Sequence, residues 1–173
     1  MKRPELVDPD ERGRVSCRTV GEVFEDRPWV IKVRETAKNS PDDQKGIDMF
    51  VRVEPALLRV LKIDGGKNVL SVQIKSAAKG VNSFVRKHAK QGRFFNKYNK
   101  SHLFVLCGME EKDLVLADIT GQIVAHVAGF GMNEKKILNY LKSFGDKAAV
   151  AAYGRNKVLL LFRWYGPHLP PLR

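Results

Sequence analysis

Cysteine, histidine and long apolar runs are scarce in this sequence, and their scarcity excludes several classes of protein. Cys17 and Cys107 are the two cysteines in 173 residues, and the four histidines are scattered singly. No C-x-x-C motif and no metal-ligand spacing occurs, so we interpret both cysteines as reduced thiols. No apolar run approaches the roughly 18 residues of a membrane span, and residues 1–13 have no apolar signal core. We therefore expect a cytoplasmic protein without a membrane partner.

Acidic residues are also few, and they are unevenly placed. The chain has 31 lysines and arginines against 19 acids, for a net charge of +12 and a pI near 9.9. Such an excess indicates a polyanionic partner, with nucleic acid first and an anionic membrane surface second. Between Gly65 and Met109 no acid occurs. The cations there that we expect to bind nucleic acid are Lys79, Arg86, Lys87, Lys90, Arg93, Lys97 and Lys100.

Composition is otherwise that of an ordinary globular domain, with 43% hydrophobic and 29% charged residues. We expect a flexible arm over residues 1–10, a single domain over 11–165 and a tail over 166–173. The end of the chain, from Trp164 onward, could serve as an arm for homodimerisation, and the sequence does not decide whether it does.

The first half of the chain predicts a helix followed by strands. Apolar spacing favours a helix over 11–26, and β-branched and aromatic residues favour strands over 29–33 and 47–53. A polar turn separates them at 36–45. The apolar stretch 57–63 leads into an Asp-Gly-Gly turn at 64–68 and a strand at 69–74, for which hairpin pairing across the turn is the simplest arrangement.

The second half predicts a basic helix over 82–98, short strands at 103–107 and 114–117, and a helix at 118–128. Asn133 is expected to cap a further helix that stops at Gly145. The last segments, 150–153 and 157–164, suggest a hairpin, although residues 148–152 could equally be helical. The predicted fold class is α/β, a mixed central sheet with helices packed on it.

Polar residues at the ends of two predicted strands form the candidate site. Asp48 begins the strand of 47–53, and Gln73 and Lys75 end the strand of 69–74. Residues two apart on a strand share a face, so Gln73 and Lys75 point the same way. Pairing of the two strands would bring Asp48 beside them, which places an acid, an amide oxygen and an amine together.

At Gly46-Ile47-Asp48 and Gln73-Ile74-Lys75-Ser76 the sequence resembles the PD-(D/E)XK superfamily of restriction-endonuclease-like nucleases, in its G-I-D and Q-x-K-S variant. The resemblance implies a restriction-endonuclease-like fold and Mg²⁺- or Mn²⁺-dependent hydrolysis of phosphodiester bonds. By resemblance, Asp48, Gln73 and the Ile74 carbonyl bind the metal and Lys75 steers the attacking water. The family also has a glutamate on the helix before the first strand, for which Glu22 is our choice and Glu25 the reserve.

The chemistry explains why those residue types occur together. A divalent cation held by oxygen ligands stabilises the charge that develops on a phosphate and lowers the pKa of bound water. A nearby lysine adds positive charge and orients that water. We therefore expect a metal-dependent endonuclease acting on DNA more than on RNA.

Three other interpretations stay open. Neutral Gln73 holds a cation less strongly than a carboxylate, so the protein could be an inactive nucleic-acid-binding member of the same fold. A basic adaptor for an acidic protein or a membrane surface is a weaker hypothesis. Taken singly, Asp48 could cap a turn, and Lys75 could protect an edge strand.

Overall fold

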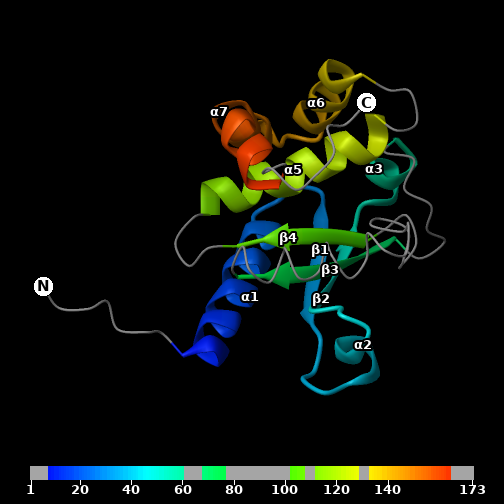
Figure 1. The fold of residues 1–173 in the computed structure, drawn as a ribbon. Helices are drawn as coiled ribbons and strands as arrows, with labels where there is room; N and C mark the ends of the chain where they lie inside the picture. The colour runs from blue at the N-terminus through cyan, green and yellow to red at the C-terminus, as the bar shows by residue number, and fades with distance from the viewer. Residues whose placement is uncertain (1–7, 61–67, 77–101, 108–111, 129–132, 165–173) are drawn as a thin grey trace, which may run out of the picture.

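The computed structural model describes residues 8–60, 68–76, 102–107, 112–128 and 133–164 (Figure 1). The expected basic helix at 82–98, residues 64–67 of the expected turn, the C-terminal tail and most of the N-terminal arm lie outside these ranges. At the end of that turn, Asn68 has a φ of 50°, the left-handed backbone that asparagine tolerates in turns.

A four-stranded mixed sheet lies at the centre of the described chain. Its strands are β1 (Val30–Glu35), β2 (Met49–Val53), β3 (Val69–Lys75) and β4 (His102–Leu106), in the spatial order β1-β2-β3-β4. The first three pair antiparallel, whereas β4 runs parallel to β3. The predicted mixed α/β architecture is therefore confirmed, and the predicted strands at 29–33, 47–53, 69–74 and 103–107 correspond to these four.

Helix α1 (Pro9–Glu25) precedes the sheet, where a helix was predicted at 11–26. Asp8 caps it through a hydrogen bond from Asp10 N, and Pro9 occupies its first turn, where a missing N–H costs nothing. The helix buries Val20 and Phe24 against the sheet. Two short helices, α2 (Pro41–Gln44) and α3 (Pro55–Val60), lie in the connections on either side of β2.

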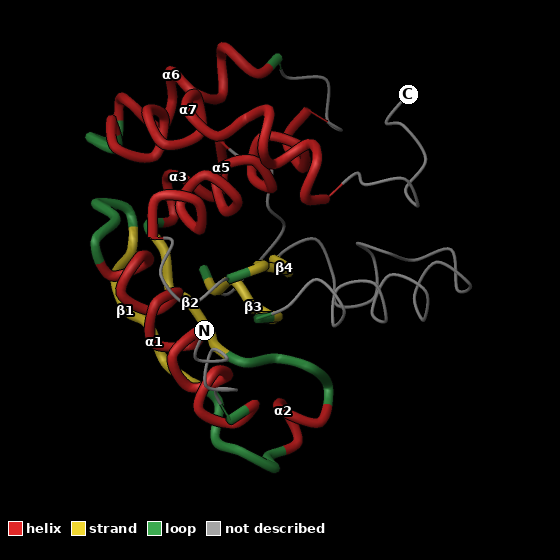
Figure 2. The backbone as a smooth tube through the Cα atoms, turned by 60° about the vertical axis from the view of Figure 1, so that its left-hand side comes forward, coloured by secondary structure: helices red, strands yellow, loops and turns green. Residues whose placement is uncertain are grey.

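Three helices form the remainder of the described chain: α5 (Lys112–Ala128), α6 (Glu134–Ser143) and α7 (Lys147–Trp164). Figure 1 shows α5 between the sheet and the α6–α7 pair, and Figure 2 shows the same grouping from another side. Asn133 caps α6 as predicted, by accepting from Lys136 N, and Gly145 follows it with a φ of +87°.

A buried carboxylate fastens this helical layer to the start of the sheet. Asp146 accepts from Trp29 Nε1 and from Arg27 Nη1, each at 2.7 Å, and from Ala149 N at 3.1 Å. Only 1% of the Asp146 side chain is exposed. Because a buried charge needs partners on all sides, this cluster links α1 and β1 to α7 over more than a hundred residues of sequence.

The two faces of the sheet differ in character. Register pairs Met49 with Val72 and Val72 with Leu103, and all three are buried on the face covered by α1 and α5. Phe50, Ser71 and Gln73 occupy the opposite face, because successive strand residues alternate between faces. Gln73 and Lys75 therefore share a face, as the sequence predicted.

The prediction of a strand at 114–117 was wrong, because these residues lie inside α5. Leu114, Val115, Leu116 and Ala117 are all buried, so the helix is apolar around its circumference. A run that is apolar on every side has no period with which to distinguish a buried helix from a buried strand.

Two hairpin predictions were also wrong. A hairpin was predicted between the stretch at 57–63 and the strand at 69–74, but residues 55–60 form the helix α3, whose first residue is Pro55. The strand β3 pairs with β2 instead. Residues 147–164 form α7, so the helical alternative considered for 148–152 is the correct one. Gly154 is exposed on α7, where a helix tolerates it.

Candidate functional site

Asp48 lies just before β2 and is held against the end of β3. Its backbone N–H donates to the Val72 carbonyl at 2.8 Å, and its carbonyl accepts from Thr36 N at 2.9 Å. Its carboxylate Oδ2 accepts from Ile74 N at 2.6 Å. The Asp48 side chain therefore continues the hydrogen bonding between β2 and β3 by one step. This holds the carboxylate at the end of the sheet where β2 begins and β3 ends.

Gln73 lies next to this carboxylate on β3, with its amide oxygen buried. Gln73 is 6% exposed, and no residue within the described ranges donates a hydrogen bond to its Oε1. An unpaired buried oxygen is costly unless something else binds it. Its environment therefore suits an additional electropositive partner.

Ile74 and Lys75 complete the group that the sequence predicted. The Ile74 N–H donates to Asp48. Because the N–H and the carbonyl of a strand residue point to the same side of the strand, the Ile74 carbonyl also faces the Asp48 side of β3. Lys75 is half-buried, and its positive charge acts to lower the pKa of Asp48. The structure thus brings together Asp48, Gln73, Ile74 and Lys75.

Gly46 shows why a glycine precedes this aspartate, a role that the sequence analysis missed. Its φ is +80°, and a β-carbon at this position would lie 2.7 Å from Gln73 Nε2. A side chain would therefore meet both an unfavourable backbone conformation and the amide. The glycine of the G-I-D segment allows the loop after α2 to pack directly on Gln73.

The pKa of Asp48 is raised above its usual value, chiefly because burial disfavours the charged form. The Ile74 hydrogen bond and the charge of Lys75 act in the opposite direction, and Asp43 adds a further upward contribution. Asp43 is a neighbour that the sequence analysis did not single out. Additional positive charge beside Asp48 would lower its pKa, as the charge of Lys75 does.

The thiol of Cys17, on α1, has a raised pKa. Burial raises its pKa to about 12, and the charges of Asp48 and Glu35 add to the effect. Cys17 and Cys107 both carry thiols that are not joined in a disulfide, as expected. At neutral pH Cys17 is therefore a protonated thiol with little nucleophilic character.

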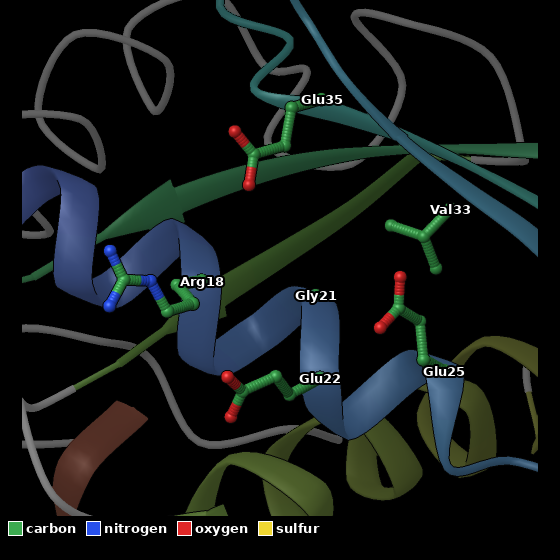
Figure 3. A pocket seen from close by; sticks show the side chains of 6 residues that line it. All are labelled: Arg18, Gly21, Glu22, Glu25, Val33 and Glu35. Carbon is green, nitrogen blue, oxygen red and sulfur yellow. The ribbon is translucent and has the colours of Figure 1, made fainter.

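The structure does not bring Glu22 to Asp48. Its carboxylate contacts Lys112 Nζ at 2.5 Å, and this pairing lowers the pKa of Glu22. Glu22 and the reserve residue Glu25 line a hollow of about 260 Å³ between α1 and β1 (Figure 3). The other residues lining this hollow are Arg18, Gly21, Val33 and Glu35.

The predicted cations of the nucleic-acid track all lie outside the described residues, so the structure does not place them. They are Lys79, Arg86, Lys87, Lys90, Arg93, Lys97 and Lys100.

The donor set fits a hard cation with oxygen ligands, but it carries a single carboxylate. Asp48, Gln73 Oε1 and the Ile74 carbonyl are oxygen donors of the kind that Mg²⁺ accepts. Within the described ranges no group of three or more histidine, cysteine, aspartate or glutamate side chains is placed to hold a metal. A single carboxylate with neutral oxygens holds a divalent cation less strongly than several carboxylates do.

None of the helices in the described ranges has the length and apolarity to cross a membrane. Comparison of the chain with protein-family models, curated proteins and solved structures gives no match.

Proposed function

We propose that this chain is a metal-dependent nuclease with a restriction-endonuclease-like fold that hydrolyses phosphodiester bonds of DNA at Asp48, Gln73 and Lys75. One observation carries the proposal: the Asp48 carboxylate accepts from Ile74 N at 2.6 Å, next to the buried amide of Gln73 and within reach of the charge of Lys75. The mixed sheet with a helix before its first strand agrees with the proposed fold.

Each residue has a part that follows from its chemistry. Asp48, Gln73 Oε1 and the Ile74 carbonyl would hold Mg²⁺ or Mn²⁺, which when bound stabilises charge on the phosphate and acidifies water. Lys75 would orient that water and attract the phosphate. The net charge of +12 favours a polyanionic substrate, for which we propose DNA.

Cleavage assays with purified protein test the proposal. Duplex, branched and single-stranded DNA, and RNA, are incubated with Mg²⁺, Mn²⁺ or chelator. We expect cutting only with metal, and a loss of about 100-fold or more in Asp48→Ala and Lys75→Ala, since both groups act on the reacting atoms. Lys142→Ala on α6 removes the same charge as Lys75→Ala and is expected to cut normally. Equal cutting by all four proteins would refute the site.

A catalytically inactive nucleic-acid-binding protein of the same fold is the second candidate. Two observations favour it: Gln73 is neutral, and Glu22 is paired with Lys112 instead of facing Asp48. An inactive protein would retard DNA equally with and without metal, and no metal would produce cleavage. A nuclease would retard DNA in chelator and cut it once metal is added.

A further inference from the structure

Three cations lie on the face of the sheet opposite to α1. On β1 these are Lys32 and Arg34, and on β2 it is Arg52. Register places Lys32 beside Arg52 and Arg34 beside Phe50, so all four side chains share this face. All three cations are exposed, and Phe50 is half-buried. They form a basic patch, called here the sheet-face patch: Lys32, Arg34 and Arg52.

The sheet-face patch carries three positive charges on adjacent strands. Over the ranges that the structure describes, none of its three cations lies in an ion pair. Arg34 Cζ lies 5.0 Å from the centroid of the Phe50 ring, a cation–π contact that holds the guanidinium but leaves its N–H donors available. Glu35, next along β1, lines the hollow on the opposite side, against α1.

Protection of an edge strand explains only part of this pattern. Charged side chains on an edge strand discourage pairing with another chain, and β1 is the edge of the described sheet. Arg52 is on β2, which pairs with a strand on each side, so edge protection gives no reason for it. A shared partner on this face explains all three cations together.

The spacing of the patch suits phosphates that continue away from the proposed site. Lys32 and Arg34 are two residues apart on one strand, which corresponds to about 6.8 Å. Successive phosphates on one DNA strand rise about 3.4 Å along the helix axis, but their through-space separation is larger because the strand winds around that axis. Two cations about 6.8 Å apart are therefore near the separation of neighbouring phosphates on one strand. Phe50, between the patch and the site, is two residues from Asp48 on the same chain segment.

We propose that the sheet-face patch binds the phosphate backbone of duplex DNA on the side of the proposed catalytic site formed by β1 and β2. This inference rests on the proposed function and adds a substrate-binding surface to it. The guanidinium of Arg34, oriented by Phe50, contacts one phosphate, and Lys32 and Arg52, which lie side by side across the β1–β2 pair, contact a neighbouring phosphate. Each contact contributes through release of counterions.

The test compares two triple variants with equal loss of charge. One is Lys32→Gln/Arg34→Gln/Arg52→Gln on the sheet face. The control, Lys135→Gln/Lys136→Gln/Lys142→Gln, alters exposed residues of α6, which lies beyond α5 from the sheet (Figure 1). Binding of a blunt DNA duplex is measured in chelator over a range of salt concentrations, so that no cleavage occurs.

We expect the plot of log affinity against log salt to become shallower by about 2 to 3 in the sheet-face variant and to stay unchanged in the control. Each single substitution, Lys32→Gln, Arg34→Gln or Arg52→Gln, is expected to lower the slope by about 1. The single variants provide the answer if the triple variant does not fold.

The failure of this inference can be separated from failure of the proposed function. If the sheet-face variants and the α6 control bind with the same slope as the parent, the patch is not a DNA contact, and the nuclease proposal stands on its own cleavage assay. If the parent binds no DNA at all, both proposals are overturned. If binding falls in the sheet-face variants but persists in Lys75→Ala, the patch acts in substrate binding as proposed.

Discussion

Gly46 packs against the amide of Gln73, with a hypothetical β-carbon only 2.7 Å from Nε2. We expect Gly46→Ala to lower the free energy of unfolding by about 1–2 kcal/mol, because alanine is strained at a φ of +80°. The added methyl also displaces the Gln73 amide, so metal-dependent cleavage should fall.

Gly154→Ala is the matched control: nothing lies within 4 Å of its β-carbon, and a helical alanine should stabilise the protein by about 0.5–1 kcal/mol. Urea melts of both variants measure the difference, and equal effects would contradict this account of Gly46.

Gln73→Glu should strengthen metal binding, because it adds a second carboxylate beside Asp48. The concentration of Mg²⁺ or Mn²⁺ that gives half-maximal cleavage is expected to fall about 10-fold, which corresponds to roughly 1.4 kcal/mol of binding free energy. In chelator the same variant should be less stable than the parent, because two close carboxylates repel. Gln73→Met removes the amide oxygen and serves as the opposite control. Identical metal titrations for all three proteins would remove Gln73 from the ligand set.

Asp48 should make both cleavage and stability depend on pH. Its pKa is raised by burial, so the folded chain binds the proton more tightly than the unfolded chain does. Without metal, the free energy of unfolding should therefore decrease as pH rises from about 4, the ordinary aspartate pKa, through the raised folded pKa.

Cleavage should move in the opposite direction over the same window, because a cation needs the ionised carboxylate. Asp48→Asn keeps the size of the side chain and should abolish both trends. Urea melts in chelator and initial cleavage rates, each recorded against pH, test this. Parallel stability profiles for the parent and Asp48→Asn would show that another group titrates.

Glu22→Gln is expected to leave metal-dependent cleavage within about 2-fold of the parent, far from the 100-fold losses that removal of an acid–base group causes. The reason is that its carboxylate contacts Lys112 at 2.5 Å and lines the α1–β1 hollow. Glu25→Gln, in the same hollow, is the companion variant. A loss of 100-fold in Glu22→Gln alone would mean that Glu22 reaches the metal after substrate binds, as the family resemblance implies.

Asp146→Ala should destabilise the protein by about 3–5 kcal/mol, since it leaves the buried Arg27 guanidinium and the Trp29 N–H without their shared acceptor. The matched control is Asp113→Ala, which breaks an ion pair with Arg155 whose partners are 53% and 61% exposed. That change should cost less than about 1 kcal/mol. Thermal or urea unfolding compares the two. A similar small loss in both would show that the buried cluster is dispensable.

Local signals in the sequence predicted elements that had a clear period or a defined end. The helix over 11–26 was predicted from apolar spacing, and the Asn133 cap and Gly145 end were read from single residues. Strands were recognised where β-branched residues clustered, as in β1 and β3. These features depend only on residues within one helical turn or one strand. They can therefore be predicted from a short stretch of sequence.

Long apolar runs and partners distant in sequence were not predictable in this way. Residues 114–117 and 157–164 lie in α5 and α7, and only packing of these helices on the sheet and on each other selects a helix there. The same limit applies to Glu22: helical spacing placed it on α1, but its pairing with Lys112 depends on how α5 crosses that helix.

The sequence by itself determined that this is a basic α/β chain in which Asp48 lies at the start of one strand and Gln73 and Lys75 lie near the end of a neighbouring one, because strand alternation and composition are local properties. Only the tertiary structure decided which groups meet: Asp48 with the Ile74 N–H, Gly46 with Gln73, and Lys32 with Arg52 on one face. Such contacts join residues separated by many positions, and their geometry is set by sheet register and helix packing, which no single window of sequence contains.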